Sequence, residues 1–394
     1  MSLITGVGFS NHRNPAEAGR EAAERAMEKA GIEKPDFVFM FGTVGYKQTR
    51  LLESVRKATG GAPLSGCSGE GVIVSGAVHE TNFGVVVAVV KSDEIRFANA
   101  HSTEMSKDAM AMGQRIGDAL ALHEAEDARL LITFADGLTI NFDAMLRGLM
   151  HNCESTNAIP MIGGTACDDW SFTRTYQYCN DEVFSDGAVT TLVTGQGEVF
   201  NASRHGCVPI GNELTITKTE ANRILEIDGL PAPEVIDKYL TVEEQSRDWM
   251  KTSIYLAIGI KAPEYMRDYD DYIIRFMPMR DEKSIHVPTE LEPGTKFFMT
   301  RRDYDKIASG NQRLAEELNQ GLKGRTPRFM LQVECAGRGQ VILEQSKKQR
   351  LLRDVQSAVA NDADWFGFYA YGEFGPVGGV NSFHNYSLIL TAIP

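Results

Sequence analysis

One pattern occurs three times along this chain, and it constrains the fold more than any other feature. Each copy has an apolar strand, a helical stretch, a short strand that ends in a glycine turn, and then another apolar strand. The copies span 37–90, 130–194 and 329–392, and their glycine turns read SGCSGEG, IGGTACDD and YGEFGP. A repeat of this size predicts one duplicated α/β unit whose copies share a core. It also places three glycine turns at equivalent strand ends, where α/β sheets usually gather ligand sites.

We therefore expect an α/β fold of repeated strand-helix-strand units in two modules. The first module spans 1–205 and holds two pseudo-repeats. After residue 205 the sequence changes to short strand-like runs separated by Pro and Gly, which predicts a β-rich (α+β) insert at 206–300. The third pseudo-repeat follows at 325–394, so the second module spans 206–394. Asn14 before Pro15 predicts an early helix start, and Gly31 predicts its end.

Charge and composition narrow the function classes. The 394 residues carry a net charge of −13 and no Lys/Arg-rich run, which argues against nucleic acid or an anionic membrane as the partner. No apolar run approaches the ~18 residues that a spanning helix needs. The six cysteines, without a secretory pattern in MSLITGVGFS, predict reduced thiols. We expect a cytoplasmic protein.

Several ordered motifs then carry a family resemblance. They are PDFVFMF (35–41), PLSGCSGEG (63–71), IPMIGGTACDD (159–169), HGCVPIG (205–211), ECAGRG (334–339), GFYAYGEFGP (367–376) and FHNYSLIL (383–390). With them, nearly the whole chain resembles the FIST sensory domain family, with an N-terminal and a C-terminal module. The resemblance implies a sensor of a small ligand that is coupled to two-component or cyclic-di-GMP signalling. For one subset, the NosP-type proteins, it implies a haem that detects nitric oxide.

The resemblance also bears on the partners. No kinase, HAMP or methyl-accepting segment accompanies the motifs, so the output is expected from a separate histidine kinase or cyclic-di-GMP enzyme. The ligand is expected to be nitric oxide or a metabolite. The sequence leaves a homodimer open.

A haem would need an axial imidazole and an apolar pocket. His205 lies at the junction of the two modules beside Cys207, and Arg204 next to it could pair with a propionate. His384 and His151 are weaker candidates for the same role. No CxxCH attachment motif exists, so the haem would be a non-covalent haem b, and its iron on His205 is the only metal expected. The alternative for each histidine is a hydrogen-bonded structural imidazole.

The glycine turns suggest a second set of ligand-binding residues. A cluster of carboxylates there could hold an amino group or a cation, or could cap nearby helices. The turns match neither a dinucleotide fingerprint nor a P-loop, and they also allow close strand packing. The candidate side chains are Cys67, Glu70, Asp168, Asp169, Arg338 and Glu373.

Three functions remain. The first is a haem-based nitric oxide sensor, and the second is a haem-free sensor of a metabolite such as an amino acid. The third is a cysteine- or metal-dependent enzyme that uses Cys335 beside Arg338. Without a GxSxG, HExxH or kinase motif we expect no enzyme. For both sensors, the ligand is expected in a cavity at the seam between the two halves.

Overall fold

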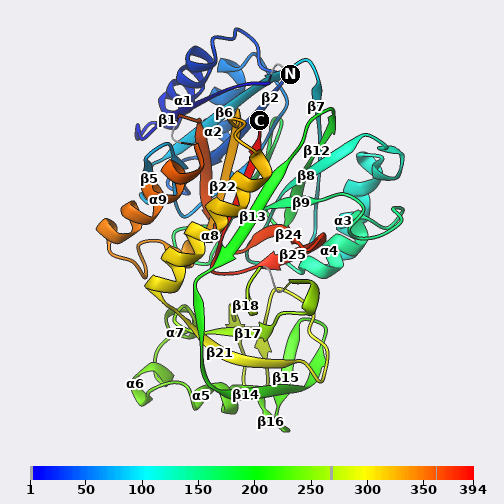
Figure 1. The fold of residues 1–394 in the computed structure, drawn as a ribbon, viewed down its shortest axis with the longest axis vertical. Coiled ribbons are helices and arrows are strands. Elements are labelled where there is room, and N and C mark those ends of the chain that lie inside the picture. The colour runs from blue at the N-terminus through cyan, green and yellow to red at the C-terminus, as the bar shows by residue number, and fades with distance from the viewer. Residues whose placement is uncertain (1–2, 267–268, 361) are drawn as a thin grey trace.

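The computed structural model describes residues 3–266, 269–360 and 362–394, and it confirms the α/β fold class and the three-fold repeat (Figure 1). Each repeat forms a strand, a helix, a strand, a helix, a third strand, a hairpin and a final strand. The first repeat has β1 (Leu3–Ser10), α1 (Pro15–Ala30), β2 (Phe37–Gly42), α2 (Gln48–Ala58), β3 (Leu64–Ser68), β4 (Val72–Val74), β5 (Ala77–His79) and β6 (Val85–Ser92).

The other two repeats follow the same element order. The second has β7 (Ile95–Thr103), α3 (Ala109–Ala119), β8 (Ala128–Ala135), α4 (Phe142–Leu149), β9 (Met161–Thr165), β10 (Gln177–Cys179), β11 (Glu182–Phe184) and β12 (Gly187–Gly195). The third has β13 (Phe200–His205), α8 (Tyr304–Leu322), β22 (Phe329–Cys335), α9 (Gln345–Ala360), β23 (Trp365–Ala370), β24 (Glu373–Val377), β25 (Val380–His384) and β26 (Ser387–Ile393).

The three sheets have the same strand order. In each of them the last two strands are a hairpin that comes from another repeat. The sheets read β1-β6-β2-β3-β10-β11, β7-β12-β8-β9-β24-β25 and β13-β26-β22-β23-β4-β5. The hairpin of the first repeat therefore completes the third sheet, that of the second completes the first, and that of the third completes the second. In each sheet the second and third strands of the repeat are parallel.

The parallel pairing requires glycine at one position of each third strand. Gly66, Gly163 and Gly367 stand in register with Met40, Thr133 and Gln332 of the neighbouring strand. A Cβ atom at any of the three would overlap the carbonyl oxygen of that partner residue. These glycines permit close strand approach, which is the structural alternative that the sequence left open.

The sheets face one another across a shared core. Phe41 of the first repeat lies 4.5 Å from Phe368 of the third and 5.1 Å from Phe134 of the second, measured between ring centroids. The same cluster holds apolar residues of all three repeats, and the helices cover the outer faces of the sheets (Figure 1). Helices outside and rings inside leave the strands buried on both faces.

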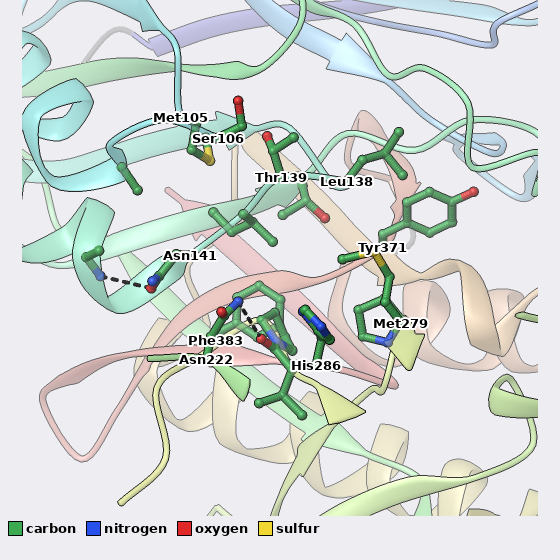
Figure 2. A pocket seen from close by; sticks show the side chains of 18 of the residues that line it. Met105, Ser106, Leu138, Thr139, Asn141, Asn222, Met279, His286, Tyr371 and Phe383 are labelled. Carbon is green, nitrogen blue, oxygen red and sulfur yellow. Dashed lines mark hydrogen bonds between the residues drawn. The ribbon is translucent and has the colours of Figure 1, made fainter. Parts of the chain in front are cut away.

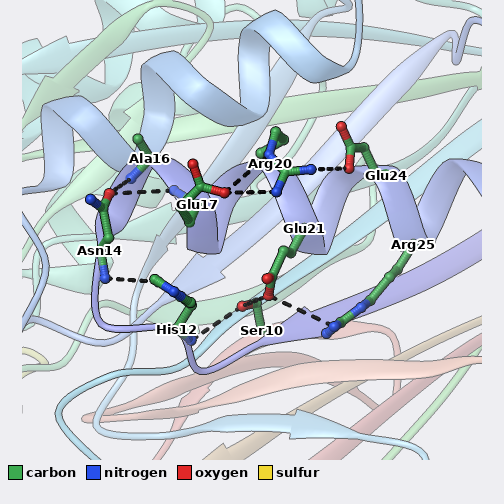
Figure 3. A network of polar contacts seen from close by, with 9 residues as sticks. All are labelled: Ser10, His12, Asn14, Ala16, Glu17, Arg20, Glu21, Glu24 and Arg25. Atoms are coloured by element: carbon green, nitrogen blue, oxygen red, sulfur yellow. Dashed lines mark hydrogen bonds and ion pairs between the residues drawn. The ribbon is translucent and has the colours of Figure 1, made fainter.

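The predicted N-terminal helix shows how local signals fix an element (Figure 3). The Asn14 side chain accepts hydrogen bonds from the amides of Ala16 and Glu17, and Pro15 occupies the first helical position. Gly31 ends α1 with φ +64°. Arg20 pairs with Glu17 at 2.7 Å on the exposed face. Capping at both ends sets the bounds of α1, as the sequence predicts.

The β-rich insert lies between β13 and α8 and forms a second lobe (Figure 1). Its sheet runs β18-β17-β21-β14-β15-β20-β19, with β16 beside β15. Its elements are β14 (Cys207–Glu220), β15 (Arg223–Ile227), β16 (Leu230–Pro231), α5 (Ala232–Asp237), α6 (Val242–Gln245), α7 (Trp249–Ser253), β17 (Ala257–Lys261), β18 (Tyr272–Arg275), β19 (Met279–Arg280), β20 (Ile285–His286) and β21 (Lys296–Arg302).

Two chain crossings join the insert to the repeats, at 205–207 and 302–304. They are tied together where the Asp303 amide donates to the Gly206 carbonyl at 2.9 Å. The insert has its own apolar cluster around Ile216, Ile258 and Met299. The division into modules at 1–205 and 206–394 stays a prediction; β13, which ends at residue 205, is a strand of the third repeat's sheet.

Candidate functional site

A cavity of about 620 Å³ lies between the second repeat and the insert, and we call it the seam pocket (Figure 2). Its first wall is the entry to α3 at 105–110 and the entry to α4 at 137–141 with Ala144. Its second wall is the insert at 276–279 and 286–288 with Asn222 and Met250. Tyr371, Phe383 and Asn385 of the third repeat close one side.

Hydrogen bonds on both sides of the seam pocket hold the insert against the repeats. At α4, the Phe142 amide donates to the Pro288 carbonyl at 3.1 Å. The Glu290 amide donates to Asp143 Oδ2 at 2.8 Å, and the Glu290 carboxylate pairs with Arg147 at 3.1 Å. The Pro288 carbonyl of the insert thus accepts a hydrogen bond from an amide in the first turn of α4. Such an amide has no partner in an isolated helix.

The opposite side is fixed by contacts to the third repeat. The Phe276 amide donates to Asn385 Oδ1 at 2.8 Å, and Arg275 Nη1 donates to the Phe383 carbonyl at 2.7 Å. Arg275 is buried, and this desolvation lowers the pKa of its guanidinium to about 10. The pocket therefore lies between two lines of polar contacts, with apolar walls in the middle.

The walls combine methionines with polar residues, and the entry to α3 adds the charged Lys107 and Asp108. Met105, Met110, Met250 and Met279 all line the pocket, and flexible thioethers adapt to ligands of irregular shape. Thr139 faces the pocket from one side, with Asn222 and His286 on the other (Figure 2). The Thr139 hydroxyl is buried and has no hydrogen-bond partner among the described residues. A ligand here would meet both apolar and polar residues.

The residues predicted for haem lie elsewhere. His205 is fully buried, accepts a hydrogen bond from the Cys207 amide at 3.0 Å, and its Nε2 faces Asp270 at 3.4 Å. Its burial lowers the pKa of the imidazole to about 4. Arg204 pairs with Glu317 at 2.6 Å, where a propionate was predicted. Burial raises the pKa of the Cys207 thiol to about 12, so this sulfur is protonated.

The other two predicted histidines are also bonded within the chain. Both ring nitrogens of His384 have partners, the Tyr269 hydroxyl at 3.2 Å and the Gly375 carbonyl at 3.0 Å. His151 contacts the Gly148 carbonyl at 2.9 Å. An iron on His384 would have to replace one of these buried hydrogen bonds, so His384 as placed does not fit an axial haem ligand. Haem binding at His205 or His151 stays a prediction.

The three predicted glycine turns do meet. Ser68 of the first turn donates to the Cys167 carbonyl of the second at 2.7 Å, and the Glu70 amide donates to the Tyr369 carbonyl at 3.2 Å. Thr165 of the second turn donates its amide to the Gly372 carbonyl of the third at 2.7 Å. Each turn is thus bonded to the other two, and we call this meeting point the axial cluster.

The side chains predicted to bind a ligand there are bonded to the chain itself. Glu70 accepts from Gln340 at 2.8 Å, and Glu373 accepts from the Ser387 hydroxyl at 2.7 Å. Burial raises the pKa of Glu70 to about 7 and that of Glu373 to about 8. Asp168 accepts from the Tyr371 hydroxyl at 2.5 Å.

Of the remaining three candidates, Arg338 lies between Glu334 at 3.1 Å and Asn311 at 2.7 Å. Cys67 is part of the apolar core, and Asp169 is exposed. Their ligand-binding role stays a prediction. Beside Cys335 the cluster leaves a hollow of about 10 Å³, which is the size of one water.

Sequence reasoning missed the residues of the seam pocket. His286 looks like an ordinary loop residue, and the methionines lie in three separate segments. The one local signal was Asn141, which caps α4 by accepting from the Ala144 amide at 3.2 Å. Within the described residues, no group of three or more His, Cys, Asp or Glu could hold a metal ion. None of the helices described there is long and apolar enough to cross a bilayer.

Comparison with known proteins explains the two-part sequence pattern. A model of the FIST N domain matches residues 36–230, and a model of the FIST C domain matches residues 232–376. The chain belongs to the FIST family. FIST domains are small-ligand sensory domains of signalling proteins.

Two relatives share low identity with this chain. An uncharacterized protein of Mycobacterium tuberculosis (strain H37Rv) is 24% identical over 396 residues, covering 97% of both chains. An uncharacterized protein of Methanocaldococcus jannaschii is 23% identical over 347 residues, covering 83% of this chain and 64% of that protein.

Solved structures resemble this FIST chain only distantly. A chorismatase has a TM-score of 0.38 and 8% identity, with 100% of this chain and 99% of that chain covered. A cyanuric acid hydrolase from A. caulinodans has a TM-score of 0.29 and 12% identity, with 50% of this chain and 71% of that chain covered. Similarity at this level supports no inference about function.

Proposed function

We propose that this protein is a non-enzymatic sensor that binds a small, largely apolar metabolite in the seam pocket. The observation that carries the proposal is the cavity itself, about 620 Å³ between two lobes of the chain. Ligand sites usually measure ~300–1,000 Å³ and favour such interfaces between parts of a fold. The axial cluster, by contrast, is filled by the protein's own side chains.

The walls indicate the chemistry of the ligand. Met105, Ile140 and Phe383 offer apolar surface, which suits a hydrocarbon or aromatic body. Thr139, Asn222 and His286 offer hydrogen bonds to one polar group. An apolar amino acid or a related metabolite has both parts, so the haem-free sensor predicted from the sequence is the function that we favour.

The signal would be a change in how the insert sits on the repeats. A ligand in the seam pocket contacts both lobes, so it stabilises the closed arrangement over an open one. A differential binding energy of ~1–3 kcal/mol is enough to shift such an equilibrium. A separate signalling protein, such as a histidine kinase or a cyclic-di-GMP enzyme, would read the position of the insert.

The test is a thermal-shift screen against a panel of apolar amino acids and aromatic acids, followed by calorimetry on each hit. A true ligand raises the melting temperature saturably, because it binds only the folded form. Ala144→Phe should fill the pocket and abolish this shift. Ala119→Phe on the exposed side of α3 is the matched control and should keep it. A hit that binds Ala144→Phe as tightly as the wild type would refute the seam pocket as its site.

Haem-based nitric oxide sensing is the alternative function, and haem titration tests it. His286 is the imidazole that lines the seam pocket. A Soret band on haem titration that disappears in His286→Ala would favour a haem sensor over the metabolite sensor. A Soret band that persists there but disappears in His205→Ala would restore the ligand predicted from the sequence. The absence of any Soret band would remove haem.

An enzymatic role has little chemical support at Cys335. Burial raises the pKa of this thiol well above 9, whereas a nucleophilic cysteine needs a lowered pKa. We therefore keep the sensor without catalysis as the proposed function.

A further inference from the structure

A second hollow, of about 430 Å³, lies beside β13 and shares no lining residue with the seam pocket. One wall is β13 at 201–204, and the opposite wall is the β24–β25 turn at 376–379. Tyr269 of the insert and Glu317 of α8 complete it. We call it the β13 hollow. Among the described strands, β13 pairs only with β26, so its other edge borders this space.

Ser203, which lines the β13 hollow, carries a buried hydroxyl that no described residue uses. Ser203 is 4% exposed, and its Oγ has no hydrogen-bond partner among the described residues. A buried polar atom without a partner costs ~1–3 kcal/mol, so such an atom in a cavity wall indicates that a ligand or a water satisfies it.

The next residue along β13, Arg204, carries a guanidinium that already holds a carboxylate. Arg204 is 7% exposed, and its Nη1 donates to the Ser203 carbonyl at 2.7 Å. Its Nη2 pairs with Glu317 at 2.6 Å. The Glu317 side chain is 48% exposed, so it can swing into solvent at little cost. The pair shows that this position accepts a carboxylate, for which arginine is well suited.

We propose that the β13 hollow is a second binding site, for a small organic carboxylate that displaces Glu317 from Arg204. The ligand carboxylate accepts hydrogen bonds from the Arg204 guanidinium and from the Ser203 hydroxyl. Its apolar remainder lies against Ala202, Pro376 and Val377, which line the same space. Glu317 thus acts as a built-in competitor when no ligand is bound. This site does not depend on the function proposed for the seam pocket.

The location also gives the ligand contact with both lobes. Tyr269 belongs to the insert, and the next residue, Asp270, pairs with Lys306 of α8 at 2.7 Å. A carboxylate in the β13 hollow would therefore lie beside one of the links between the insert and the third repeat.

The test compares 4-methylpentanoate with its neutral isostere 4-methylpentanamide, using calorimetry at low salt on the full chain. The acid should bind and the amide should not. Ser203→Ala removes one hydroxyl from a folded strand and should weaken binding of the acid about tenfold. Glu317→Gln removes the competitor and should tighten binding about threefold. Glu316→Gln, a neighbouring exposed position on α8, is the control and should change nothing.

Two further results decide the location. Ala144→Phe should leave binding of the acid unchanged, which separates the β13 hollow from the seam pocket. Equal binding of acid and amide would overturn the proposal. So would an unchanged dissociation constant in both Ser203→Ala and Glu317→Gln, and so would the absence of binding by the acid.

Discussion

The axial cluster and the seam pocket are both places where distant parts of the chain meet, yet only the seam pocket has room for more than one water. At the axial cluster three equivalent turns meet, and each bonds to the other two. At the seam pocket the second repeat meets the insert, which occurs once and has no equivalent in the other repeats. Repeated surfaces complement one another and close the space between them. A surface without a symmetric counterpart leaves room for a ligand.

The largest expected effect tests whether the shared core carries the stability. Phe41→Ala removes a ring that contacts Phe134 and Phe368 of the other two repeats. It should lower the free energy of unfolding by about 3–5 kcal/mol, measured by urea denaturation. Met279→Ala, at the half-exposed rim of the seam pocket, should cost within about 0.5 kcal/mol. Equal losses of unfolding free energy in the two variants would show that the shared core contributes no more to stability than the rim of the seam pocket.

A second, smaller effect is a pH dependence that belongs to the axial cluster. Burial raises the pKa of Glu373 to about 8, from 4.5 for an ordinary glutamate. Between these values the native state holds a proton that the unfolded state has released. The stability from this group is therefore complete below about pH 4.5 and is lost as the pH rises through 8. Glu373→Gln keeps an acceptor for Ser387 and has no proton to lose.

The stability of the wild type should thus fall relative to Glu373→Gln by roughly 2–4 kcal/mol between pH 5 and pH 9. The measurement is urea denaturation of both proteins across this range. Glu70 shifts in the same direction, but its contribution is common to both proteins and cancels in the difference. Parallel stability profiles would show that Glu373 is ionised in the native state.

The smallest effect concerns the contacts that hold the insert in place. Glu290→Ala removes the ion pair with Arg147 and a hydrogen bond from Asn141, and should cost about 0.5–1 kcal/mol. Amide hydrogen exchange should accelerate at 285–290 and 139–144 and stay unchanged in β2. Glu292→Ala, an exposed neighbour, is the control. Uniform acceleration across the chain would show that the insert does not open by itself.

The sequence predicted the repeated elements well because each has a strong local pattern. FVFMF, LLITF and the run from Phe329 to Val333 are apolar enough to be buried strands in any context, and Asn14 and Gly31 mark the ends of α1. The exchange of hairpins was not predictable, because β4 and β10 have three residues each and pair with strands of other repeats.

The candidate site was predicted only in outline. The sequence indicated that the glycine turns stand at equivalent strand ends and that a cavity lies at a seam. It could not show that the axial cluster is filled. The sequence of a glycine turn is the same whether a ligand or a protein residue such as Cys167 packs against it. Nor could it single out Thr139 or His286, since they come together only when the insert folds back onto α4.

The exchanged hairpins also determine when each sheet can gain its last strands during synthesis of the chain. The first sheet needs β10 and β11, so the ribosome must release residue 184 before that sheet has all its strands. The third sheet combines β4 and β5, made early, with β26, which ends at residue 393. The early hairpin must therefore wait for almost the entire chain to emerge before its sheet has all its strands.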